Sequence, residues 1–522
     1  MMLRLLTLCA ALAALAALPC AAAPVDLTPV PAQASPSALQ AGWEHGAFME
    51  IFVRAYQDSN GDGIGDLRGL TQHLDYLQEL GVKGLWLMPI TASSDHDHGY
   101  ATLDYRSIEP AYGTLEDFDA LIKAAHARGI GVIIDYVLNH GSLESPLFQS
   151  ALKGPDSPYR DWYVWQDQAP LGWEIWGHNP WTATPTGSYY GTFGGQMPDF
   201  NLRNPVTVEY HFSSLRFWLN RGLDGFRLDA VPHLIENGAK EWNDQPESRA
   251  LTHQVQELIK SYPQRHVVCE ATADPIAYGK PEVCGSSFAF GLQYEVIKAA
   301  RGQAEAVQKI SEYFVKAPLS MATMLTNHDL FAGQRVWDQL QGNEARMKLA
   351  AATYLLMPGT PFIYYGEEIG QAGVLNSEGD GPIRSPMSWG PQGQGFSAGQ
   401  PFRPLSPNGA THNPDVERNK PASMLNFYKA MLKLRNTRAS IAQGSYEAPK
   451  AKGQVLSFRR RLGQELSIVL INYGDKAVDV SIDGLPRQAN LRSLYPSAGT
   501  AHKRVKLAPL SVQVLSADGG AP

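Results

Sequence analysis

The sequence predicts an α/β fold: a (β/α)8 TIM barrel with an inserted subdomain after its third strand and a C-terminal antiparallel β-domain. From Phe48 onward, short β-rich runs alternate with amphipathic helical stretches, and eight such units fit into about 390 residues. No G-x-G-x-x-G follows the first predicted strand, which disfavours an open, doubly wound sheet. From about Gly444 the pattern becomes short strands separated by Gly, Pro and Asp turns.

Apolar, β-branched and aromatic runs predict the barrel strands. In chain order they are FMEIFVRAY, GLWLMP, GVIIDYVLNH, GFRLDAV, HVVCEA, a weaker FAFGLQY, ATMLTNHD and PFIYYGEE. Between the early strands, residues 67–81 and 115–129 have helical periodicity, and each ends at a Gly placed like a helix C-cap. The last predicted helix covers residues 423–436.

The domain boundaries follow changes in composition. Residues 1–23 combine an early Arg4, an Ala/Leu run and an A-x-A site, which predicts a secretory signal peptide; the apolar run is short for a membrane anchor. The protein is therefore expected to be secreted or periplasmic. The other predicted boundaries are a linker at 24–42, the barrel at 43–140 and 205–440, the insert at 141–204 and the β-domain at 444–522.

Charge and cysteine content exclude some classes of protein. The net charge of −7 is spread along the chain without a basic block, so nucleic acid is not an expected partner. No segment after the signal is apolar enough to span a bilayer. We expect the protein to be a monomer. The mature chain keeps Cys269 and Cys284, for which a disulfide and two buried free thiols both remain open.

Polar residues gather where the predicted strands end, which is where barrel enzymes place their chemistry. Three carboxylates, Asp229, Glu270 and Asp329, have this position, with Arg227 two residues before the first and His328 directly before the last. Residues two apart in a strand face the same side, so the Arg227 guanidinium is expected to keep Asp229 ionised. One ionised and one protonated carboxyl group are the minimal equipment for glycoside hydrolysis.

The chain resembles the α-amylase family of glycoside hydrolases. The segments DYVLNH, GFRLDAVPH, CEA and TNHD, in this order, are similar to the four signature regions of that family, and HGY, IEPAYGT, MPDFN and IYYGEEIG are further matches. The resemblance covers about residues 45–520. It implies a retaining reaction on α-linked glucans, and MPDFN places the chain closest to secreted, calcium-binding members intermediate between oligoglucosidase and neopullulanase types.

The resemblance also implies roles for matching residues. Asp229 would be the nucleophile, Glu270 the general acid and base, and Asp329 the carboxylate that stabilises the transition state. The residues implied to contact or align substrate are Tyr100, His140, Arg227, His233 and His328. Cys269 is expected to point away from the site. About half of the Trp and Tyr rings of the insert are expected to form its core, and the rest to offer sugars a stacking surface.

The stretch DSNGDGIGDL has the oxygen donors of a calcium loop. Its proposed ligands are Asp58, Asn60, Asp62, the carbonyl of Ile64, and Asp66. It is not a complete EF-hand, because the twelfth position is Gly69 and a strand is expected before it. Family members with this loop bind a structural Ca²⁺ there; the alternative is an Asx-turn loop without metal.

The resemblance leaves the substrate open within the family. Terminal glucosidases usually carry an Asp after HGY, where this chain has Ala101, and this favours an internally cleaving α-amylase acting on α-1,4 bonds of starch or maltooligosaccharides. Pro232, in place of the usual Lys beside His233, leaves the leaving-group subsite undefined. The alternatives are an α-glucosidase, a maltogenic or neopullulanase-type hydrolase, a glucan transglycosylase and, more remotely, a non-catalytic carbohydrate-binding relative.

Overall fold

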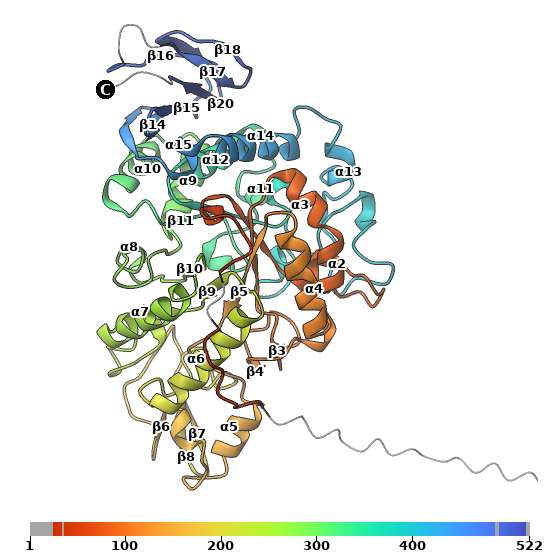
Figure 1. Cartoon of the computed structure of the whole chain (residues 1–522), viewed down its shortest axis with the longest axis vertical. Coiled ribbons are helices and arrows are strands. Elements are labelled where there is room, and N and C mark those ends of the chain that lie inside the picture. Colours follow the sequence, from red (N-terminus) through yellow and green to blue (C-terminus); the bar gives the residue numbers. More distant parts are fainter. Residues whose placement is uncertain (1–24, 34–35, 486–489, 518–522) are drawn as a thin grey trace, which may run out of the picture.

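The computed structural model describes residues 25–33, 36–485 and 490–517 (Figure 1). The predicted signal peptide lies outside these residues. Figure 1 shows an elongated molecule in which the barrel lies between the insert, with α5 and β6 to β8, and the C-terminal β-domain.

The barrel wall is a parallel sheet in which seven strands have the order β10-β9-β5-β2-β1-β12-β11. Their bounds are β1 Phe48–Ile51, β2 Gly84–Leu87, β5 Gly131–Tyr136, β9 Gly225–Leu228, β10 His266–Cys269, β11 Ala322–Thr323 and β12 Thr360–Tyr364. The gap between β10 and β11 is bridged by single parallel pairings, Cys269 with Ser287 and Phe288 with Ala322. These complete the eightfold wall and confirm the predicted fold class.

Each strand prediction extends past the observed strand, and two of them run into α-helices. The sixth, FAFGLQY, is reduced to the bridges at residues 287–288, because Leu292 already begins helix α9 (Leu292–Ala300). The first, FMEIFVRAY, ends at Ile51, and one helical turn, α1 (Val53–Tyr56), leads into the aspartate loop. The tail of the first prediction, residues 52–56, is buried throughout, and that of the sixth includes the buried Leu292, so an apolar pattern did not distinguish strand from helix.

The helices surround the sheet as expected for alternating units. Their bounds are α2 Leu67–Gln72, α3 Leu74–Leu80, α4 Leu115–His126, α6 Pro205–Asn220, α7 Pro246–Lys260, α8 Pro275–Tyr278, α10 Ala304–Lys316, α11 Val336–Gln339, α12 Glu344–Leu356, α13 Pro414–Glu417, α14 Met424–Thr437 and α15 Ala439–Gln443. The predicted helix at 67–81 is split at His73, and Gly81 caps it with a φ of 101°. Helix α4 ends earlier than predicted, with Ala127 as its C-cap.

Short 3-10 helices and a hairpin shape the loops. The 3-10 helices are Trp43–His45, Pro110–Tyr112, Arg160–Trp162, Val231–His233, Leu330–Ala332, Glu367–Ile369, Gly381–Ile383 and Pro391–Gly393. The hairpin pairs β3 (Ala92–Ser93) with β4 (Thr102–Asp104). It holds the HGY motif between its strands.

The insert after β5 is a small unit with its own sheet. Helix α5 (Pro146–Ala151) precedes β6 (Trp165–Gln166), β7 (Trp181–Thr184) and β8 (Gly187–Tyr190), which pair in the order β6-β8-β7. Trp181 and Tyr190 are buried with Ile175 in a separate apolar cluster, whereas Trp176 is 60% exposed. The insert's rings therefore divide between core and surface, as predicted.

The C-terminal domain is antiparallel, as predicted. One sheet has the order β13-β14-β15-β20-β17-β18, and β16 pairs with β19. The strands are β13 Glu447–Lys452, β14 Val455–Leu462, β15 Glu465–Asn472, β16 Val478–Ser481, β17 Arg492–Tyr495, β18 Gly499–Thr500, β19 Arg504–Leu507 and β20 Ser511–Ser516. Phe458 and Val469 belong to the same apolar cluster as the barrel, so this domain packs against the barrel.

The segment predicted as a linker is bound to the barrel where it is described. Arg106 donates to the carbonyl of Thr28, and the Val30 amide donates to Ser213 Oγ. Ser37 Oγ donates to Asp224 at 2.8 Å. The segment is held by these separate hydrogen bonds and by single apolar residues such as the buried Leu39, which produce no apolar periodicity.

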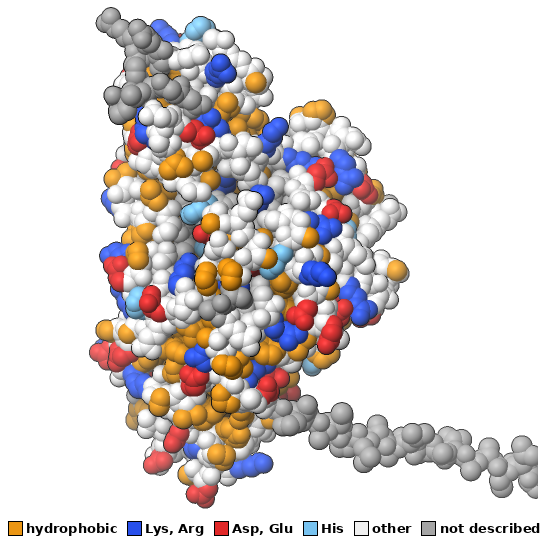
Figure 2. Space-filling model, in the orientation of Figure 1, with side chains coloured by type: hydrophobic (Ala, Val, Ile, Leu, Met, Phe, Trp, Pro, Cys, Tyr) orange, Lys and Arg blue, Asp and Glu red, His pale blue; other side chains and the backbone are white. Residues whose placement is uncertain are grey.

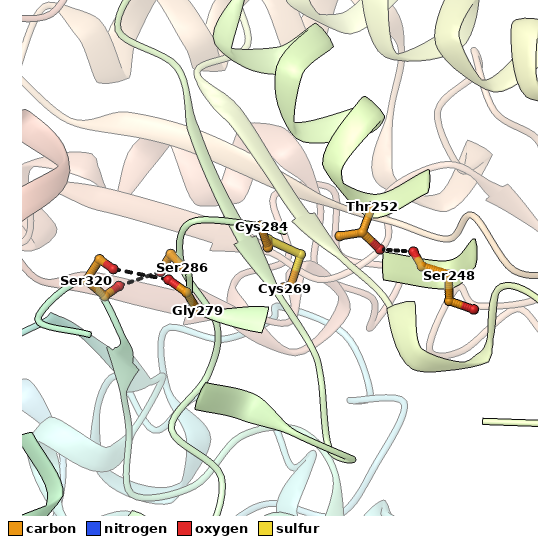
Figure 3. The surroundings of a disulfide bond; sticks show 7 residues. All are labelled: Ser248, Thr252, Cys269, Gly279, Cys284, Ser286 and Ser320. Carbon is orange, nitrogen blue, oxygen red and sulfur yellow. Dashed lines mark hydrogen bonds between the residues drawn. A yellow bond between two sulfur atoms is a disulfide. The ribbon is translucent and has the colours of Figure 1, made fainter. Parts of the chain in front are cut away.

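A disulfide joins Cys269 to Cys284, which settles the question the sequence left open. Figure 3 shows the bond between the end of β10 and the loop after α8, where Ser286 Oγ donates to the carbonyl of Ser320. The face drawn in Figure 2 carries acidic and basic side chains side by side. Among the described residues, no helix is long and apolar enough to cross a membrane.

Candidate active site

A cavity of about 630 Å³ lies at the carboxyl ends of the barrel strands. The predicted carboxylates Asp229, Glu270 and Asp329 all line it. The other lining residues are His98, Tyr100, His140, Trp176, Phe193, Met197, Ala230, His233, Thr272, Phe331, Asp380 and Arg384. The structure thus brings together residues that are far apart in the sequence.

Arg227, on β9, is the electrostatic centre of the site. Its Nη1 contacts Asp229 at 2.6 Å and both oxygens of Asp135 at 2.7 and 2.9 Å, and its Nη2 contacts Glu270 at 2.5 Å. The side chain is 1% exposed. Because one guanidinium contacts the predicted nucleophile and the predicted acid, it fixes their separation as well as their orientation.

The two carboxyl groups differ in their readiness to hold a proton. Burial raises the pKa of Asp229 to about 6 against the opposing effect of Arg227. The pKa of Glu270 is raised to about 7 by burial, with Arg227 acting to lower it and Asp229 to raise it. Near neutral pH, therefore, Asp229 is mainly ionised while Glu270 is protonated in a large fraction of molecules.

The backbone after Asp229 turns sharply. Ala230 adopts a φ of 44°, in the left-handed region that non-glycine residues rarely occupy. Its amide donates to Glu270 Oε2 at 3.3 Å, and the 3-10 helix Val231–His233 follows directly. The turn couples the end of β9 to the residue that follows β10.

Asp329 belongs to a second charged group. Arg384 contacts Asp329 at 3.1 Å and Asp380 at 2.9 Å. Burial, with a contribution from Glu270, raises the pKa of Asp329 to about 7. Asp329 is thus the third carboxylate of the cavity, held by a different arginine from the other two.

His328 and Tyr100 form a hydrogen-bonded wall. His328 Nε2 lies 2.7 Å from Tyr100 Oη, and its Nδ1 lies 2.6 Å from Glu50 Oε1. Tyr100 Oη also donates to Asp135 at 2.8 Å. The two rings are nearly parallel, with centroids 5.5 Å apart, so Tyr100 presents an aromatic face to the cavity.

The remaining predicted histidines are neutral and available. Burial lowers the pKa of His140 to about 3 and that of His233 to about 4. His140 Nε2 and His233 Nδ1 are buried without a hydrogen-bond partner. His233 stacks on Trp242 at 5.3 Å, with Trp176 edge-on to it. Unpartnered nitrogen atoms in a polar cavity are suited to bind sugar hydroxyl groups.

The sequence interpretation missed several residues of this site. Glu50 lies in β1, inside an apolar run, and Asp380 and Arg384 lie in the long loop after β12. A glutamate in a buried strand was the available signal for Glu50, because charged residues are almost never fully buried without a partner. No local feature of the sequence predicted Arg384, because its position in the site depends on the path of its loop.

The aspartate loop has the predicted oxygen donors in one turn. Asp58 accepts from the amides of Asn60, Gly61 and Gly63, and Asp66 accepts from Gly69 N and caps α2. In the described part of the chain, no group of three or more His, Cys, Asp or Glu side chains is arranged to hold a metal ion. The loop does supply carboxylate, amide and carbonyl oxygens, which are the donors that Ca²⁺ prefers. Calcium binding at this loop stays a prediction.

The fold and site are those of one enzyme family. The chain matches the family model "Alpha amylase, catalytic domain" over residues 50–444, and it belongs to this family. It is accordingly an enzyme of the glycoside hydrolase and transglycosylase type.

Relatives of several activities are similar to the chain. It is 34% identical to "Trehalose synthase/amylase TreS" of Mycolicibacterium smegmatis over 81% of each chain. It is also 34% identical to "Alpha-amylase 3" of Dictyoglomus thermophilum, over 82% of this chain and 85% of that one. The solved structure of the alpha-glucosyl transfer enzyme XgtA superposes with a TM-score of 0.80 and 25% identity, covering 92% of this chain and 100% of that one.

Proposed function

We propose that the protein is an α-amylase that hydrolyses internal α-1,4-glucosidic bonds of starch or maltooligosaccharides with retention of configuration. The observation that carries the proposal is the single guanidinium of Arg227 that contacts Asp229 and Glu270 at 2.6 and 2.5 Å. Such a bridge holds two carboxyl groups close together, as the covalent mechanism requires.

The chemistry then divides between the two groups. The Asp229 carboxylate attacks the anomeric carbon while protonated Glu270 gives its proton to the departing glycosidic oxygen, so the glycosidic bond breaks as a glycosyl ester forms. Glu270 next takes a proton from water, whose oxygen attacks the anomeric carbon and releases Asp229. Two inversions give net retention. Asp329 and the unpartnered Nε2 of His140 would bind hydroxyl groups of the same sugar, and His328 would act through Tyr100, which it contacts at 2.7 Å.

Exposed aromatic rings around the cavity support internal cleavage. Trp176 from the insert is 60% exposed, and Phe331 from the loop after β11 is 50% exposed. Rings on two separate elements can stack on glucose units on either side of the cleaved bond. Ala101, where terminal glucosidases usually carry an Asp, is buried and offers no charge for a chain end.

Product analysis tests this proposal. Starch, pullulan, maltotriose, sucrose and trehalose are incubated with the protein, and Asp229→Asn is the inactive control. Mixed maltooligosaccharides from starch, with the α-anomer formed first by NMR, support the amylase. Glucose alone, or products of the β-configuration, would contradict it. Full activity in Asp229→Asn would reject the assigned nucleophile.

Glucosyl transfer is the second candidate function. The names "Trehalose synthase/amylase" and "alpha-glucosyl transfer enzyme" among similar proteins favour testing it. Transfer would use the same glycosyl ester, with a sugar hydroxyl group in place of water. Longer oligosaccharides from maltotriose, or trehalose from maltose, would support transfer and would replace hydrolysis as the main activity if they dominate.

We also propose export and a structural calcium ion. Export rests on the signal-like residues 1–23, together with the disulfide between Cys269 and Cys284, a bond typical of oxidising compartments. The calcium ion would be held by Asp58, Asn60, Asp62, Asp66 and the Ile64 carbonyl. Its contribution would be rigidity of the loop after β1. N-terminal sequencing of the exported protein and metal analysis test these two statements.

A further inference from the structure

A second polar cavity lies at the opposite end of the barrel from the active site. It measures about 410 Å³ and is bounded by the beginnings of strands: His45 precedes β1, His266 begins β10 and Thr360 begins β12. The C-terminal domain closes it with Arg460 of β14. This cavity, called the basal cavity below, takes no part in the chemistry proposed above.

Two buried guanidiniums that form no ion pair with any described residue lie at the basal cavity. Arg460, which lines it, and Arg435, which contacts three of its walls through the carbonyls of His45, Gly359 and Ala442, are each 1% exposed. Neither has a carboxylate within 4.0 Å among the described residues. Burial lowers the pKa of both guanidiniums to about 9, so both remain charged at neutral pH.

The donors of Arg460 are only partly used. Its Nε, Nη1 and Nη2 donate to the carbonyls of Ser445, Leu356 and Gly444, three bonds for five N–H groups. Carbonyl groups solvate a guanidinium but do not neutralise it, and buried charges are normally paired. Lys260 adds another cation to the lining.

Two further atoms in the lining are buried without a hydrogen-bond partner. His266 Nε2 belongs to a side chain that is 6% exposed, and Glu44 Oε2 is buried although its residue is only half-buried. Glu44 is the single carboxylate among the lining residues, against Lys260, Arg460 and two histidines. The basal cavity therefore offers several donors and one isolated acceptor.

We propose that the basal cavity binds a protonated oxyanion, namely hydrogenphosphate. Its oxygens would accept from Arg460, Lys260 and His266, and its O–H would donate to Glu44. A fully deprotonated oxyanion such as sulfate supplies the charge but cannot satisfy Glu44, so the site discriminates between the two. Because Arg460 comes from the C-terminal domain and the other groups from the barrel, the bound anion fastens one domain to the other.

Thermal unfolding and calorimetry on the full mature protein test the proposal. Sodium phosphate, sulfate and chloride are compared at equal ionic strength. Phosphate is expected to bind with a measurable heat and to raise the melting temperature along a saturating curve. Sulfate is expected to bind at least about tenfold more weakly, since one charged hydrogen bond is replaced by repulsion. Equal, non-saturating effects of both salts would reflect general exclusion from the surface and would overturn the proposal.

Variants locate the site. Lys260→Met, at an exposed position at the end of α7, is expected to weaken phosphate binding by about tenfold or more. Glu44→Gln should remove the preference over sulfate. Arg460→Met should abolish binding; if it does not fold, Lys260→Met carries the test. Arg459→Met, the neighbour that donates instead to the carbonyl of Asp483, is the matched control.

Asp229→Asn should keep phosphate binding. Loss of binding in Asp229→Asn, or its full retention in Lys260→Met, would place the anion elsewhere.

Discussion

Replacing Arg227 by Met should shift the pH dependence of catalysis rather than merely lower its rate. In the parent protein, Asp229 has a pKa of about 6 and Glu270 one of about 7. The active form has Asp229 ionised and Glu270 protonated, so the pH profile of kcat/KM should be bell-shaped with a maximum at about 6.5. Because the groups share one guanidinium, both limbs belong to the pair.

The size of the shift follows from the ion pairs that the substitution removes. An opposite charge at this range lowers a carboxyl pKa by about 1–3 units, so without Arg227 the pKa of Asp229 rises to about 7–9. The fraction of ionised Asp229 at pH 7 then falls from about nine-tenths to between about one half and one hundredth. Both limbs should move to higher pH by about 1–3 units, and activity should partly return at pH 8–9.

The assay is kcat/KM on a chromogenic maltooligosaccharide between pH 5 and 10. Arg227→Lys is the companion variant: it keeps a positive charge but loses the planar fork, so it should hold the limbs nearer their parent positions while lowering kcat. If Arg227→Met loses activity by the same factor at every pH, Arg227 only orients the carboxylates and the electrostatic argument is wrong. Thermal unfolding of each variant shows whether it is folded at assay temperature.

Three further predictions concern stability. Replacing Cys269 and Cys284 by Ala removes a cross-link between positions 15 residues apart and should lower the free energy of unfolding by about 3 kcal/mol in denaturant titrations. Dithiothreitol should have no further effect on the stability of this variant. Chelation should lower the melting temperature and added Ca²⁺ restore it, whereas Asp62→Asn should respond weakly; no response in the parent would remove the calcium proposal. Burial raises the pKa of Glu367 and Glu368 to about 7 and that of Glu417 to about 8. The folded state therefore binds more protons than the unfolded state above about pH 4.5. The free energy of unfolding should fall as pH rises from 4.5 to 8, and Glu368→Gln should make this fall less steep.

The sequence was sufficient to predict the barrel because its strands are buried on both faces. Runs such as residues 131–136 are apolar at nearly every position, and every residue of β5 is buried in the structure. It was insufficient at the sixth strand, where the barrel closes by two single pairings rather than a continuous ladder. The buried Phe288 and Ala289 give this segment an apolar run, but the run continues into α9 and so does not mark where the pairing stops.

The site residues that follow barrel strands could be predicted from the sequence, whereas those in long loops could not. Asp229, Glu270 and Asp329 follow β9, β10 and β11, and the carboxyl ends of parallel strands meet at one end of a barrel. Arg384 and Asp380 escaped because they lie in a loop whose route depends on contacts such as Arg384 Nε with the His328 carbonyl, at 2.8 Å. Local sequence does not encode such a route.

Strand β10 connects the two cavities of the protein. Its first residue, His266, lines the basal cavity, and the residue after its last, Glu270, lines the active site. Between them Cys269 is tied to Cys284, which also lines the basal cavity. The strand is four residues long and pairs with β9 along its whole length, from His266 with Gly225 to Cys269 with Leu228. The disulfide and the basal cavity thus lie on the same short strand as the residue that precedes Glu270, while no described residue lines both cavities.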